Sequence, residues 1–317
     1  MSIHYIDPLS RALGRMKKAL FKPFDIGKWF TLGFTAFLAG LTDCHHGKGS
    51  SDSNGVKVHD LSDIVDFPRN AWEWLLDHPG WFTLIVFGVL FLIALVILLT
   101  WLSSRGKFMF LDNVVHERAK VIKPWHEFRI LGNSLFLWRL CFGLICLVLF
   151  IMFLVFCYGI FVSLYESYAP RHTVILAIVG MVLSVLLMLI IKAYISLFLN
   201  DFVAPIMYKN NAKIIQAWSR FLSLFSNHLL YFIFYGLLVF LLHILVIICV
   251  IIAGLLTCCI GLILLIIPYI GSVITLPISY TFRAFSLEFL GQFGPEFTVF
   301  PPSEDSSVSA SGSTNAG

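Results

Sequence analysis

The segment Trp81–Leu102, WFTLIVFGVLFLIALVILLTWL, decides the fold class because it runs for 22 residues without a charged side chain. A helix needs about 20 apolar residues to cross a hydrocarbon core roughly 30 Å thick. Three further segments meet this requirement: Trp138–Leu164, with Arg139 at its edge; Thr173–Leu199, with Lys192; and Leu229–Ala253, with His243. The sequence therefore predicts an all-α, polytopic membrane helix bundle.

The composition of the whole chain supports this class. Of its 317 residues, 59% are hydrophobic and 13% are charged, whereas a soluble domain has about 25% charged residues. The mean hydropathy is +0.89. These values exclude an ordinary soluble protein and a disordered one, and seven cysteines are too few for a disulfide-rich secreted scaffold.

Two weaker segments raise the predicted number of spans to about six. Ile260–Phe282 is apolar but is interrupted by Pro268 and Pro277, and Trp29–Leu41 is only 13 residues long. If Trp29–Leu41 crosses, 18 of the 22 basic residues lie on one side, and otherwise the split is 12 to 10. Because cytoplasmic loops collect Lys and Arg, we expect it to cross and both termini to be cytoplasmic. We also expect this span to remain uncleaved, since no small residue precedes Ala39 at the position that a signal-peptide cleavage site requires.

The predicted organisation has three parts. Residues 1–28 contain a cytoplasmic amphipathic helix over 7–22, with Asp7 as its N-cap and Pro8 as its first residue. Its predicted apolar face and basic flanks would rest on anionic lipid headgroups; these residues are Leu9, Leu13, Met16, Leu20 and Phe21, and Arg11, Arg15, Lys18 and Lys22. Residues 29–300 form the membrane domain, with spans near 29–41, 81–102, 138–164, 173–199, 229–253 and 260–282 and an outer loop at 42–80. Residues 301–317 form a disordered tail.

Few residues in this chain are candidates for chemistry. Cys44, His45 and His46 resemble a metal cluster, but no second pair at ligand spacing supports it, and a solvated polar loop is the simpler interpretation. Within the spans, Lys192 can extend to the inner surface. His243 can be a neutral side chain bonded to a backbone carbonyl, and either residue could instead be functional. No carboxylate pairs with them in the sequence pattern, and no catalytic motif is present. We therefore expect neither an enzyme nor a cofactor nor an ion-coupled carrier, and nothing indicates nucleic-acid binding.

Two cytoplasmic connections resemble each other and predict an internal repeat. In the first, Leu111–Val115 (LDNVV) is followed by the W-x-x-F segment Trp125–Phe128; in the second, Asn200–Ala204 (NDFVA) is followed by Trp218–Phe221. In each, an acidic residue ends the incoming span. The two units point the same way, unlike the inverted repeats of many transporters.

Several stretches resemble an uncharacterised family of prokaryotic multi-pass membrane proteins. They are Ser10–Gly40 (SRALGRMKKALFKPFDIGKWFTLGFTAFLAG), Leu111–Leu140, Asp201–Leu222 and Tyr280–Phe297 (YTFRAFSLEFLGQFGPEF). This family is distantly similar to the membrane domain of some glycerophosphoryl diester phosphodiesterases. The resemblance implies a prokaryotic cytoplasmic membrane protein, and it implies no phosphodiesterase activity because the catalytic barrel and its acidic metal site are missing.

Two functional hypotheses follow. The first is a non-catalytic scaffold, assembly factor or partner of another membrane protein, which the scarcity of charge within the spans favours. The alternative is a transporter, channel or lipid-handling protein that uses the proline-broken last span together with Lys192 or His243.

Overall fold

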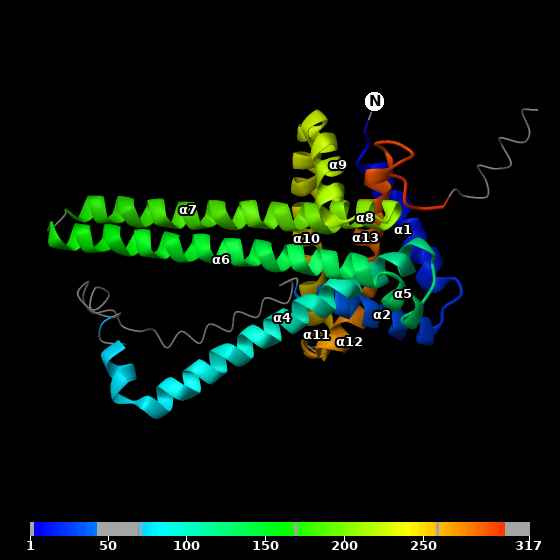
Figure 1. Cartoon of the computed structure of the whole chain (residues 1–317). Coiled ribbons are helices and arrows are strands. Elements are labelled where there is room, and N and C mark those ends of the chain that lie inside the picture. Colours follow the sequence, from blue (N-terminus) through cyan, green and yellow to red (C-terminus); the bar gives the residue numbers. More distant parts are fainter. Residues whose placement is uncertain (1–2, 43–68, 70–71, 168–169, 258–259, 302–317) are drawn as a thin grey trace, which may run out of the picture. The chain divides into compact units, whose positions relative to one another are not determined.

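The computed structural model of the chain describes residues 3–42, 69, 72–167, 170–257 and 260–301. Within these ranges the regular structure is entirely helical, as predicted. The chain divides into two compact units: residues 1–43, 102–136 and 196–317 form unit 1, and residues 44–101 and 137–195 form unit 2. The long helices α4, α6 and α7 contribute residues to both units (Figure 1).

Among the described residues, four helices are long and apolar enough to cross a membrane, and they correspond to the four strongest predicted spans. They are α4 (Pro79–Val115), α6 (Arg129–Glu166), α7 (Arg171–Phe198) and α10 (Leu229–Leu256). At 1.5 Å per residue, the 37 residues of α4 extend about 55 Å, which exceeds the roughly 30 Å hydrocarbon core. The polar end of α4 therefore continues beyond its apolar segment and enters the core of unit 1.

The two weaker predicted spans correspond to helices shorter than the four long ones. The first corresponds to α2 (Ile26–Gly40), which has 15 residues. The region of the second contains α11 (Ile260–Ile266), α12 (Pro268–Ile274) and the start of α13 (Leu276–Gly291). The breaks fall at Pro268 and Pro277, each in the first turn of a new helix, where the missing N–H and fixed φ of proline are tolerated.

Two helix pairs assemble unit 1, and each joins segments far apart in the sequence (Figure 1). Helix α2 packs on α12, where a Cβ at Gly33 would lie 2.5 Å from a methyl carbon of Val273, so only glycine permits this approach. The Tyr269 hydroxyl donates a hydrogen bond to the Phe30 carbonyl at 3.1 Å. Helix α1 (Ile6–Phe21) packs along α13.

Helix α1 differs from its prediction in two respects. It begins at Ile6, and its N-cap is Tyr5 rather than Asp7. The Tyr5 ring stacks on Phe289 at a centroid distance of 5.6 Å. The predicted apolar face is also divided in the structure. Leu20 of that face is buried together with Pro8, Ala12 and Ala19, whereas Leu13 and Phe21 remain exposed. Of the predicted basic flanks, Arg15 pairs with Glu288 of α13 at 2.6 Å.

An aromatic cluster forms the centre of unit 1. Phe202 lies on η1 (Leu199–Val203), a π-helical turn between α7 and α8 (Ala204–Asn210), and it is completely buried. Its ring meets those of Phe221 on α9 (Ile214–Asn227) and Tyr235 on α10 at centroid distances of 5.6 and 4.8 Å. These contacts bring the end of α7, the connection between α7 and α10, and α10 itself into one core.

Candidate functional site

The residues singled out from the sequence lie in different parts of the chain. Cys44, His45 and His46 fall outside the described residues. Lys192 is exposed on α7. The Nδ1 atom of His243 lies 2.8 Å from the Val239 carbonyl, the geometry of the backbone-bonded interpretation, and its ring stacks on Phe282. The described residues contain no group of three or more His, Cys, Asp or Glu side chains placed to hold a metal ion.

A polar network in unit 1 surrounds the end of α4. Asp112 is 1% exposed, and its carboxylate accepts hydrogen bonds from Arg118 Nη2 at 2.8 and 3.0 Å and from the Tyr208 hydroxyl at 2.8 Å. Buried charges persist only when they are paired and hydrogen-bonded, and Asp112 meets both conditions. It therefore ties the loop that follows α4 to α8.

Asn113, the neighbour of Asp112, fixes the same loop through hydrogen bonds from its side chain to the loop backbone. This side chain is completely buried; its Oδ1 accepts from the Lys120 amide and its Nδ2 donates to the Lys120 carbonyl, both at 2.9 Å. Between these anchors, Glu117 adopts a left-handed φ of 50°, which is uncommon for a residue other than glycine. The loop is thus held in one geometry by two adjacent buried side chains.

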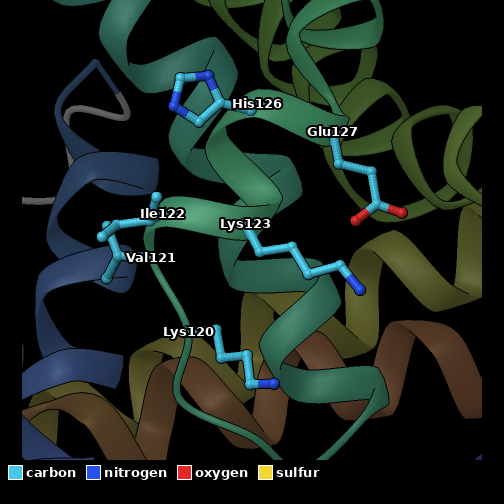
Figure 2. Close-up of a pocket in the computed structure, with 6 residues that line it drawn as sticks. All are labelled: Lys120, Val121, Ile122, Lys123, His126 and Glu127. Atoms are coloured by element: carbon cyan, nitrogen blue, oxygen red, sulfur yellow. The ribbon is translucent and has the colours of Figure 1, made fainter.

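The fixed loop leads into α5 (Ile122–Glu127), and together they form a hollow on the surface of unit 1. The hollow has a volume of ≈ 850 Å³ and is lined by Lys120, Val121, Ile122, Lys123, His126 and Glu127. Figure 2 shows the side chains of Lys120 and Lys123 extending in one direction and those of Val121 and Ile122 in another. The hollow therefore combines a cationic part with an apolar part.

A second polar network lies at the π-helical turn η1. The Lys107 ammonium donates to the Asn200 side chain, and Arg283 Nη1 donates to the Asn200 carbonyl at 2.7 Å. The neighbouring Asp201 carboxylate accepts a hydrogen bond from Tyr235 at 2.9 Å. Arg283, His243 and Lys107 lie close enough to Asp201 to interact with its carboxylate electrostatically, an arrangement that the sequence pattern did not indicate. π-Helical turns occur often at functional sites.

Sequence reasoning identified Asp112 and Asp201 as the acids of the two similar connections but missed their partners. It also missed a row of buried polar residues in the last turns of α4, which are Ser103, Ser104, Lys107 and Asn113. These residues follow the apolar segment directly, so their composition resembles that of a solvated loop. In the sequence, the similarity of the two connections was the signal that pointed to these acids. In the structure, each acid accepts a hydrogen bond from a tyrosine.

Comparison with known proteins gives one match. Residues 3–276 match a family described as "Family of unknown function (DUF7544)". The chain belongs to this family. No curated protein and no solved structure matches the chain. The matched residues cover α1 to α12, so they include the hollow, the Asp112 network and most of the second network, whereas Arg283 lies beyond residue 276. The family assigns no activity to any of these features.

Proposed function

We propose that this chain is a multi-pass protein of a prokaryotic cytoplasmic membrane, and that it acts as a non-catalytic scaffold or assembly partner of another membrane protein. The observation that carries the proposal is the exposure of its long apolar helices. In the most apolar stretches of α4, α6 and α7, no residue is buried within the described structure. These helices therefore leave their surfaces to lipid or to helices of other chains.

The size of the exposed side chains strengthens this argument. Phe156 on α6 is 65% exposed and Leu176 on α7 is 72% exposed. Helix association in a membrane depends on packing between complementary surfaces, and large contiguous apolar surfaces mark sites of membrane or protein contact. A protein whose task is to hold a partner needs such surfaces, whereas a carrier must enclose its substrate. Neither the hollow at α5 nor a second one lined by Phe156, Gly159, Ile160, Ser163 and Leu164 is lined by Lys192 or His243.

In the proposed topology, α2 and the α11–α13 region supply two crossings in addition to the four long helices, with both termini in the cytoplasm. The distribution of basic residues supports this topology, with 18 of 22 on one side. In the same proposal α1 contacts anionic lipid through the part of its predicted face that the structure leaves exposed. The exposed residues include the apolar Ile6, Leu13 and Phe21 and the basic Lys17, with Lys22 directly after the helix, a combination suited to a membrane surface.

The alternative function, in transport or lipid handling, has one supporting observation. Lys107, Asp201 and Arg283 bring three ionisable groups together beside the π-helical turn, and Arg283 lies on α13, which begins at the second proline break. Ionisable groups close to a membrane interior are functional candidates by default. This network would then be the substrate or proton site.

Site-specific crosslinking in membranes tests the scaffold proposal. A photoreactive residue at Phe156 or Leu176 is expected to crosslink to one defined protein, and the same residue at the buried Phe232 is expected to give no intermolecular product. Lipids and small molecules that copurify are identified in parallel. Adducts with lipid only, together with an enriched small molecule whose retention requires Arg283, would contradict the scaffold proposal and favour the alternative.

A further inference from the structure

The hollow at α5 places positive charge beside exposed apolar surface. We propose that it binds one anionic phospholipid, with the headgroup phosphate between Lys120 and Lys123 and the first acyl carbons against Val121 and Ile122. This site is separate from α1 and does not depend on the scaffold proposal.

The charge of the hollow favours an anion. Lys120 and Lys123 are exposed and extend in the same direction (Figure 2), and Glu127 is the acidic residue among the six that line the hollow. Two ammonium groups and one carboxylate leave a net positive charge. A phosphate diester offers acceptor oxygens to lysine, which binds phosphate as a point charge.

The apolar part of the hollow selects a lipid over a free anion. Ile122 is 78% exposed, so its side chain gains from contact with hydrocarbon. The guanidinium carbon of Arg105 lies over the ring of Trp125, also on α5, 5.0 Å from the ring centroid. Tryptophan and arginine with an apolar neighbour are typical of a membrane interface. Because the described part of the chain includes four helices long and apolar enough to cross a membrane, lipid is the amphiphile that such a surface meets.

The framework beneath the hollow keeps the cationic part in place. Asn113 holds the Lys120 backbone through two hydrogen bonds, and Asp112 holds Arg118 in the same loop. A site supported by buried, hydrogen-bonded side chains requires less ordering when a ligand binds. Two adjacent buried polar residues therefore have a role beyond stability, since they fix the position of a lysine that faces the ligand.

The second connection of the predicted repeat provides an internal comparison. Its residues Lys213 and Ile215 precede Trp218 at the same spacing at which Lys120 and Ile122 precede Trp125. Ile215 is 78% exposed, as Ile122 is. However, Gln216 stands where the first connection has Lys123, and Ser219 stands where it has His126. The second connection therefore lacks the pair of lysines and is not expected to bind the lipid.

Titration of the purified chain with short-chain phosphatidylglycerol or phosphatidylcholine, followed by native mass spectrometry, tests this proposal. We expect phosphatidylglycerol to bind more tightly than phosphatidylcholine. The double variant K120Q/K123Q is expected to weaken the tightest phosphatidylglycerol site about 25-fold, since each lysine near an anionic surface contributes about fivefold. Glu127→Gln removes the opposing charge and is expected to strengthen binding about fivefold.

The matched control is K209Q/K213Q, which makes the same charge change at two exposed lysines of the second connection and is expected to leave the tightest site unchanged. Ile122→Ser is expected to weaken phosphatidylglycerol binding, and Ile215→Ser is not. All of these side chains are exposed, and helix content is checked by circular dichroism. Equal losses in both double variants, or unchanged affinity in K120Q/K123Q, would overturn the proposal. Unchanged lipid affinity with loss of an acidic protein partner would assign the hollow to a protein instead.

Discussion

Replacing Asp112 by alanine is expected to lower the free energy of unfolding by about 1.5–3 kcal/mol, the usual contribution of hydrogen bonds to a charged group, because Asp112 is buried whereas its partner Arg118 is partly exposed and regains contact with water. The substitution leaves the guanidinium of Arg118 and the hydroxyl of Tyr208 without the carboxylate that both contact. It also detaches α8 from the loop after α4. Equilibrium unfolding in mixed detergent, followed by tryptophan fluorescence, measures the loss.

Glu127→Ala is the matched control for this experiment, because Glu127 is an exposed acid of the same connection. Surface substitutions of this kind usually change stability by no more than about 0.5 kcal/mol. If D112A and E127A unfold at the same denaturant concentration, the Asp112 network does not stabilise unit 1, and the argument for a fixed hollow fails with it.

Phe202→Ala is expected to cost about 3–5 kcal/mol, because it creates a cavity where a large aromatic side chain was buried. Phe202 has no exposed surface, and its ring contacts rings from α7, α9, α10 and α13. The loss should be cooperative, since one residue joins four helices. Differential scanning calorimetry of the purified chain measures it through the transition temperature.

The same substitution at Phe156 tests whether the effect depends on position. Phe156 lies on α6 and is 65% exposed, so its removal leaves no cavity. We expect Phe156→Ala to unfold close to the unsubstituted chain. A transition temperature for Phe202→Ala that matches that of Phe156→Ala would show that the aromatic cluster is not the core of unit 1.

The apolar helices could be predicted from the sequence because hydropathy alone decides them. The segment Trp81–Leu102 falls within α4, and Thr173–Leu199 coincides with α7 and the first residue of η1. The proline-interrupted segment Ile260–Phe282 was predicted as one span, and in the structure α11, α12 and the start of α13 occupy it. What hydropathy could not predict was that α4 continues for another 13 residues to Val115. Six of those residues are polar or charged, which ends the apolar run, and the stretch is helical and largely buried because distant segments pack around it.

Tertiary partners explain the other differences. Arg15 was predicted to flank a membrane-bound face, but it pairs with Glu288, a residue 273 positions further along the chain. Lys107 and Asn200 meet across 93 positions. No local pattern encodes such pairs, and a charged residue that will be buried looks like one that will be solvated. The acids Asp112 and Asp201 were noticed only because the two connections resemble each other.

The central claim is that the apolar segments cross a membrane and place the basic residues on one side. A topology reporter inserted after residue 55, in the predicted outer loop 42–80, measures this directly, with insertions after Asn211 between α8 and α9 and at the C-terminus as references. We predict an extracytoplasmic signal from the insertion after residue 55 and cytoplasmic signals from both references. A cytoplasmic signal after residue 55 would contradict the six-span topology, the crossing of Trp29–Leu41 and the assignment of 18 of the 22 basic residues to one face.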